Sequence, residues 1–117
     1  MRYHLDFAGP LAYWQELLVG AATTLGLSVA ATVLGFGLGV LCAIARTSRS
    51  PAAARITGAY VEAIRNTPLL VQIFIVYFGL ATVGIKLSAF TAAIAALVIN
   101  VGAYTAEIIR AGIGSVP

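Results

Sequence analysis

Residues 17–45 read LLVGAATTLGLSVAATVLGFGLGVLCAIA, and this stretch decides the fold because it contains no charged residue. It fills the 29 positions between Glu16 and Arg46. An uncharged apolar run of about 18 residues or more is long enough to cross a bilayer as a helix. At a rise of ~1.5 Å per residue, this helix exceeds the ~30 Å hydrocarbon core, so we expect it to tilt or to extend past the membrane.

Two further stretches have the same character. Twenty uncharged residues separate Arg65 from Lys86, and twenty more separate Lys86 from Glu107. Of the 117 residues in the chain, 61% are hydrophobic and 9% are charged. A bilayer offers the backbone no hydrogen-bonding partner, so spanning segments satisfy their polar groups within a helix. The sequence therefore predicts an all-α integral membrane protein, a helical bundle with three transmembrane helices.

The predicted organisation is an exterior amino-terminal segment over residues 1–16 and a membrane domain over residues 17–117. We expect no cleavable signal peptide, because residues 1–16 carry charges and the first apolar run is too long for one. Tyr13 and Trp14 suit the boundary between membrane and water. The third span is expected over about residues 87–109, ended by the glycines and proline of AGIGSVP, and an exterior turn is expected around Gly79 and Gly84.

The basic residues predict the orientation. Arg46, Arg49 and Arg55 fall in one short connection, which the positive-inside rule assigns to the cytoplasm. The amino terminus is then outside. The net charge of +3 is explained by this orientation and requires no nucleic-acid partner.

Two prolines near the second span have different consequences. Ser50 is a good helix N-cap and Pro51 fits the first helical turn, so a helix is expected to begin there. Pro68 lacks the amide that would bond the carbonyl four residues earlier, so we expect one helix with a kink at this point. The alternative is a break, in which Asn66 or Thr67 caps a new helix at Pro68.

Small residues mark the face on which the first span packs. Gly35 and Gly39 form a small-xxx-small pair, which allows close approach between membrane helices. The segment GFGLG also resembles a phosphate-binding loop, but such a loop follows a strand and precedes a soluble helix. This segment has neither a strand before it nor a soluble helix after it, so we interpret it as a packing face.

Residues for catalysis or metal binding are scarce. His4 is the single histidine and Cys42 the single cysteine, so the chain has no histidine or cysteine cluster for a metal and no Ser–His–Asp set. Cys42 is interpreted as a small packing residue. No Walker lysine motif is present. The sequence therefore predicts that the chain is not an enzyme and itself binds no metal and no cofactor.

Polar side chains within the spans form the candidate site. Asn100, Tyr104 and Glu107 are spaced i, i+4, i+7 and share one helical face. Such groups are costly in a membrane and often mark a pathway, but they also join helices through hydrogen bonds. For Asn100, and for Gln72 in the second span, both lining of a pathway and hydrogen bonding between helices stay open. Thr67 can also bond back to the carbonyl of Ala63.

Charged residues near the cytoplasmic ends of the spans form a second group. Glu62 and Arg65 are three residues apart, as are Glu107 and Arg110, so each pair can meet on one helical surface. They are interpreted either as ion pairs that hold helices in register or as part of the site.

Two longer runs resemble a known family. Residues 60–80, YVEAIRNTPLLVQIFIVYFGL, and residues 102–117, GAYTAEIIRAGIGSVP, resemble the permease subunits of bacterial ABC importers for polar amino acids, the histidine, glutamate, glutamine, arginine and opine branch. The resemblance extends over about residues 24–117. It implies a subunit of the bacterial inner membrane that forms the translocation pathway of an ATP-driven importer.

The resemblance also implies partners, and the polar residues in and beside the spans supply the candidate site. The partners are cytoplasmic ATPase subunits that use ATP, a second permease subunit in a homo- or heterodimer, a periplasmic amino-acid-binding protein and the membrane lipid. The expected pathway residues are Asn66, Thr67, Gln72, Asn100, Tyr104 and Glu107. The expected structural or gate residues are Glu62, Arg65, Pro68 and Arg110.

The chain departs from this family at its carboxyl end. In the family the SVP run is followed by a cytoplasmic coupling helix and two more spans, giving typically five, whereas this sequence stops at Pro117. The chain therefore looks like the amino-terminal half of a permease. The alternatives are a permease of another ABC importer branch, such as methionine or phosphonate, and a truncated membrane subunit that does not transport.

Overall fold

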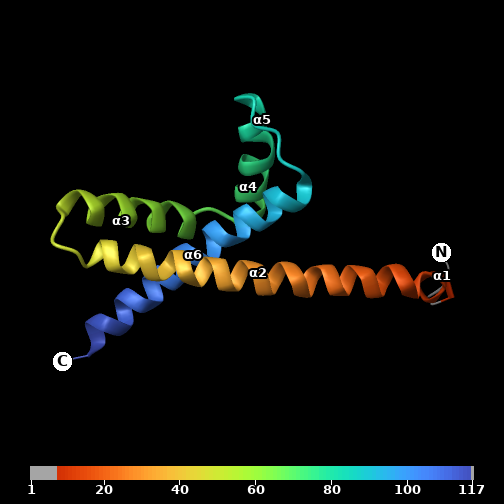
Figure 1. Ribbon diagram of the computed structural model, residues 1–117, viewed down its shortest axis with the longest axis horizontal. Coiled ribbons are helices and arrows are strands. Elements are labelled where there is room, and N and C mark those ends of the chain that lie inside the picture. The colour runs from red at the N-terminus through yellow and green to blue at the C-terminus, as the bar shows by residue number, and fades with distance from the viewer. Residues whose placement is uncertain (1–7, 117) are drawn as a thin grey trace, which may run out of the picture.

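The computed structural model describes residues 8–116, and all the regular secondary structure in that range is helical (Figure 1). The predicted all-α class is therefore confirmed. The elements in chain order are α1 (Ala8–Ala12), α2 (Trp14–Arg46), α3 (Pro51–Arg65), α4 (Leu69–Phe74), the π-helical turn η1 (Ile75–Gly79), α5 (Leu80–Thr82) and α6 (Ala89–Ser115).

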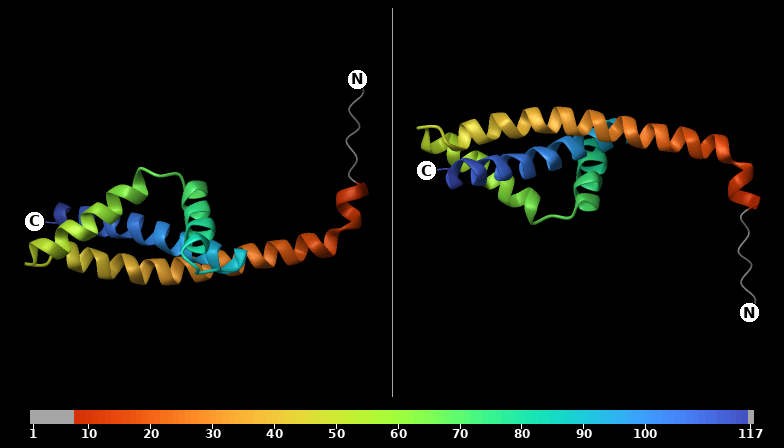
Figure 2. Two further views of the ribbon diagram at one scale, coloured as in Figure 1. Left: turned by 90° about the horizontal axis from the view of Figure 1, so that it is seen from above. Right: turned by 90° about the horizontal axis from the view of Figure 1, so that it is seen from below.

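Within residues 8–116, two helices are each long and apolar enough to cross a membrane. These are α2, with 33 residues, and α6, with 27. They run in the same direction, so their carboxyl ends lie at the same end of the molecule (Figures 1 and 2). The third candidate span is a broken pair, in which α3 and residues 69–82 meet at a bend of 112°.

The connection between α3 and α4 differs from the predicted kinked helix. Helix α3 ends at Arg65, and Pro68 is extended with φ −61° and ψ 144° just before α4 begins. A residue before proline is disfavoured in helical geometry, so Thr67 cannot continue α3. The predicted kink is wrong and the break is found, although no side chain caps the amino terminus of α4. Residues 66–68 are called the joint below.

Other helix boundaries were predicted with mixed success. The cap at the start of α3 is confirmed, because Ser50 Oγ accepts a hydrogen bond of 3.3 Å from the Ala53 amide and Pro51 opens the helix. The predicted end of the third span is wrong, because α6 continues through Gly112 and Gly114. Glycine costs a helix about 1 kcal/mol relative to alanine but keeps its N–H, so it need not end the helix.

The predicted turn before the third span and the predicted amino-terminal segment also have different boundaries in the structure. The chain stays helical through Gly79, and the turn lies at Gly84, whose φ of +92° suits glycine. Helix α2 begins at Trp14, inside the predicted segment of residues 1–16. Residues 1–7, including His4, lie outside the described range.

The most extensive contact between helices is that of α2 with α6, and it is built from small side chains. On α2 the buried residues recur every fourth position, namely Ala31, Gly35, Gly39 and Ala43. A Cβ added at Gly35 would lie 2.6 Å from Val101 Cβ, and one added at Gly39 would lie 2.5 Å from Thr105 Cβ. The two backbones therefore approach too closely for larger residues at these two positions.

The opposite faces of the helices carry large apolar side chains. Along α2 these include Leu25, Val33 and Phe36, all well exposed in the isolated chain. A helix that buries small residues and exposes large apolar ones is suited to lipid or to further membrane helices, because lipid gives large apolar side chains a favourable environment.

Candidate functional site

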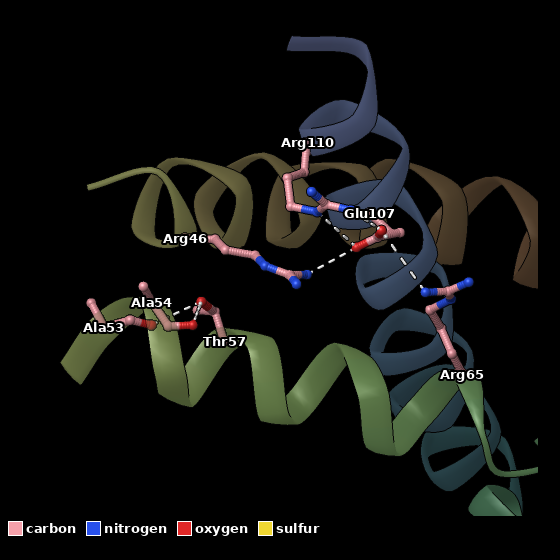
Figure 3. A network of polar contacts seen from close by, with 7 residues as sticks. All are labelled: Arg46, Ala53, Ala54, Thr57, Arg65, Glu107 and Arg110. Carbon is pink, nitrogen blue, oxygen red and sulfur yellow. Dashed lines mark hydrogen bonds and ion pairs between the residues drawn. The ribbon is translucent and has the colours of Figure 1, made fainter. Parts of the chain in front are cut away.

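Glu107, on the carboxyl half of α6, contacts three arginines (Figure 3). Arg46 Nη1 donates to Glu107 Oε2 at 2.9 Å. Arg110, one turn further along α6, donates from Nε to Oε2 at 3.2 Å and from Nη2 to Oε1. Arg65 Nη1 lies 3.9 Å from Oε1, at the limit of an ion pair. We call these four residues the Glu107 cluster.

The Glu107 cluster ties two helix ends to α6. Arg46 is the last residue of α2 and Arg65 is the last residue of α3. A cation at a helix carboxyl terminus also interacts favourably with the helix dipole. Arg65 and Arg110 are nearly half exposed, so their pairs are individually weak in water. The cluster acts mainly by fixing where α2 and α3 end relative to α6.

Of the two ion pairs considered from the sequence, one is present among residues 8–116 and the other is not. Glu107 and Arg110 do contact each other. Glu62 is exposed and has no ion pair among residues 8–116, because Arg65 reaches towards Glu107 instead. A pair on one exposed helical surface gains only a few tenths of a kcal/mol, so a second helix can easily outcompete it.

Gln72, in the first turn of α4, is the one buried polar side chain of the described range, with 5% of its surface exposed. Its Nε2 donates to the carbonyls of Ile64, at 3.0 Å, and Thr67, at 2.9 Å. Its Oε1 accepts a hydrogen bond of 3.2 Å from Asn100 Nδ2 on α6. Gln72 therefore joins α3, α4 and α6 through a single side chain.

The remaining pathway candidates stand apart from these contacts. Thr67 Oγ1 donates to the Ala63 carbonyl at 2.7 Å, the local bond considered from the sequence. Asn66 is exposed at the end of α3. Tyr104 lies between Asn100 and Glu107 on α6 with 43% of its surface exposed, and its hydroxyl has no hydrogen bond within residues 8–116.

Two residues of these contacts were not among the sequence candidates. Arg46 was interpreted only as a marker of orientation, although it ends one uncharged run much as Glu107 ends another. Tyr60 donates a hydrogen bond from its hydroxyl to the Ile99 carbonyl of α6. Its position five residues before Arg65 on α3 gave no signal that it would reach across to another helix.

These features define a class of protein. The molecule is a helical membrane protein whose polar side chains meet between helices, and residues 8–116 hold no group of histidine, cysteine, aspartate or glutamate suited to a metal. Residues 35–117 match the family described as binding-protein-dependent transport system inner membrane component. The chain belongs to this family of transport components.

Curated relatives are permease proteins. The chain is 40% identical over 106 residues to the L-cystine transport system permease protein TcyB of Bacillus subtilis (strain 168), covering 91% of this chain and 45% of that protein. It is 37% identical over 114 residues to the arginine transport system permease protein ArtQ of the same organism, covering 97% of this chain and 52% of that one.

A solved structure has the same fold. A crystal structure of an amino acid ABC transporter with histidines matches 98% of this chain with a TM-score of 0.92 and 39% identity, covering 54% of that chain. The nopaline transport system permease protein NocM of Agrobacterium fabrum (strain C58 / ATCC 33970) is 40% identical over 111 residues, covering 86% of this chain and 46% of that protein. The chain thus spans about half the length of the relatives it matches.

Proposed function

We propose that this chain forms part of the translocation pathway of an ATP-driven importer for polar amino acids. The observation that carries the proposal is the match of almost the whole chain to an amino acid ABC transporter at a TM-score of 0.92. Permeases for cystine, arginine and nopaline among its relatives support a polar amino acid as substrate.

The proposal includes the partners and the setting. The chain lies in a bacterial inner membrane with its amino terminus outside and pairs with a second permease subunit. Cytoplasmic ATPase subunits hydrolyse ATP, and a periplasmic binding protein delivers the amino acid. The chain itself makes no covalent change to the substrate. Its helices move so that the pathway opens alternately to each side of the membrane.

The proposed pathway wall is the face of α6 that carries Asn100, Tyr104 and Glu107, together with the joint. Tyr104 is the member of this face whose polar group has no hydrogen bond to residues 8–116, so it is best suited to meet a polar substrate. Polar groups at membrane depth are expected to face protein or a water-filled cavity, which supports a pathway beside this face.

The experiment is an uptake assay with the complete complex. The whole permease, its ATPase and its binding protein are reconstituted in liposomes, and uptake of radiolabelled arginine, cystine and glutamine is followed with ATP. We expect uptake of at least one of them, and none when the ATPase carries a substitution that prevents hydrolysis. An assembled complex that hydrolyses ATP but imports no amino acid from a full panel of twenty would contradict the proposal.

A further inference from the structure

The joint leaves the Thr67 carbonyl without a backbone donor among residues 8–116, while the Ile64 carbonyl accepts a hydrogen bond of 3.2 Å from the Thr67 amide. Helix α3 stops at Arg65, and Pro68 has no N–H to offer to the last carbonyls of α3. The carbonyl of Thr67 is likewise outside any helix. Unpaired backbone groups are costly away from water, so a break in this setting needs a donor from elsewhere.

Gln72, from the other side of the joint, gives the Thr67 carbonyl a donor and the Ile64 carbonyl a second one. Its side-chain amide bonds the carbonyls of Ile64 and Thr67, while its own backbone amide bonds the Pro68 carbonyl at 3.2 Å. The side chain therefore folds back over the joint and links the end of α3 to the start of α4. Because the Gln72 side chain is buried, water cannot readily replace these hydrogen bonds if they are lost.

Helix α6 contacts the residues on both sides of the joint. Asn100 holds the carbonyl oxygen of the Gln72 side chain, on the α4 side. Glu107, seven residues further along the same face of α6, faces Arg65 at the end of α3. One helical face thus contacts the chain on both sides of the joint, at Arg65 before the break and at Gln72 after it.

We propose that Gln72 is a positioning residue that locks the bend between α3 and α4, and that α6 controls this lock through Asn100. A shift or rotation of α6 then reaches α4 through one buried hydrogen bond. The lock itself rests on the contacts above. Its part in moving helices during transport rests on the proposed function.

The lock is tested by measuring the bend directly. In the whole permease, assembled in its complex and held in lipid nanodiscs, one pair of spin labels is placed at Ile56 on α3 and at Val83 after α5. These side chains are 70% and 71% exposed, so labels fit without disturbing contacts. Pulsed electron–electron resonance then gives the distribution of distances across the joint, without reference to substrate or uptake.

Three variants and a control give distinct expectations. Gln72→Leu removes both donors, and we expect a broad, shifted distribution, with the population of the native bend reduced about tenfold relative to relaxed states. Asn100→Leu should broaden it less, because Gln72 still spans the joint. The double variant should be no broader than Gln72→Leu, since Asn100 acts through Gln72. Gln15→Leu is the matched control and should leave the distribution unchanged, because Gln15 lies exposed in the first turn of α2.

A second readout separates positioning from general stability. Variants that only weaken the fold lower the amount of assembled complex, while the surviving complex keeps the native distance. A loosened lock instead alters the distance in fully assembled complex and raises the ATP hydrolysed per amino acid imported. If Gln72→Leu fails to assemble, Asn100→Leu and the shorter amide in Gln72→Asn carry the same comparison.

The proposal is overturned if assembled Gln72→Leu, or both milder variants, keep the native distribution. A double variant broader than Gln72→Leu would show that Asn100 acts independently of Gln72 and would also overturn it. Absence of ATP-driven uptake by the unaltered complex would instead contradict the proposed function, while the distance measurements would still report on the lock.

Discussion

Arg46 and Glu107 are 61 positions apart in the sequence, yet the guanidinium of the first donates to the carboxylate of the second at 2.9 Å. The contact joins the last residue of α2 to the carboxyl half of α6. It depends on the close packing of the same two helices at Gly35 and Gly39, because that packing fixes which residues of α2 and α6 lie side by side.

We expect Glu107→Gln to lower the thermal stability of the permease more than Glu62→Gln does. Both changes remove one negative charge, but within residues 8–116 Glu107 contacts arginines and Glu62 does not, so the loss of Glu107 leaves Arg46 and Arg110 facing each other without a counter-charge. The melting temperature in detergent should fall by a few degrees for Glu107→Gln, the shift typical of a loss of this kind.

Salt provides an internal check on that expectation. The difference between the two variants should shrink in 1 M salt, where charges are screened over about 3 Å. Equal melting temperatures at low salt would show that the Glu107 cluster contributes nothing measurable to stability.

Gly39→Leu is expected to disrupt the α2–α6 contact, and Gly37→Leu is its matched control. An added Cβ at Gly39 would lie 2.5 Å from Thr105 Cβ and 3.0 Å from the Gly102 carbonyl, whereas one at Gly37 would have nothing within 4 Å. Overpacking typically costs about 1–3 kcal/mol, and here the obstacle includes backbone. Gly35→Leu should behave as Gly39→Leu does.

The measurement for the glycine variants is the fraction of monodisperse complex after heating in detergent. Gly37→Leu reports the general effect of a leucine in α2, since both positions lie in the same helix two residues apart. If Gly35→Leu and Gly39→Leu match Gly37→Leu, the small residues do not determine helix packing.

The sequence predicted what depends on local patterns. Uncharged runs predicted the helical class, and the Ser50–Pro51 pair predicted the start of α3, because capping involves neighbours in the chain. A kinked helix was predicted at Pro68, with a break at the same place as the alternative. The structure has the break, and Gln72 from the next helix donates to the Ile64 and Thr67 carbonyls beside it; no local pattern shows that this side chain reaches back across the joint.

The contacts of the candidate site depend on the register between helices. The i, i+7 spacing placed Asn100 and Glu107 on one face of α6, but their partners come from α4, α2 and α3. The residue of α2 that contacts Glu107 is determined by the register of α2 along α6. The close approach of α2 at Val101 and Thr105 fixes that register. Arg46 was for this reason recognised only in the structure.

The orientation is tested with single cysteines in a Cys42→Ala background. Ser48→Cys, between α2 and α3, should resist an impermeant thiol reagent added from outside, and Val83→Cys should react. Val83 is preferred to Gly84, whose φ of +92° would strain any larger residue. Labelling of Ser48→Cys from outside in intact cells would reverse the proposed topology, and permeabilised cells, in which both should react, provide the control.

Tyr104 distinguishes a pathway from mere packing on α6. Its hydroxyl has no hydrogen bond within residues 8–116 and its side chain is 43% exposed, whereas Asn100 on the same face is engaged with Gln72. If this face lines the pathway, Tyr104→Phe should reduce amino acid uptake by the complete complex while leaving its abundance, melting temperature and basal ATP hydrolysis unchanged, because the lost hydroxyl makes no hydrogen bond to residues 8–116. Asn100→Leu should instead reduce uptake and stability together. Ile108→Ala, an exposed apolar position on the same helix, controls for a smaller side chain on α6. Normal uptake in both Tyr104→Phe and Tyr104→Leu would remove Tyr104 from the pathway and leave the polar face of α6 with only its role in holding α2, α3 and α4.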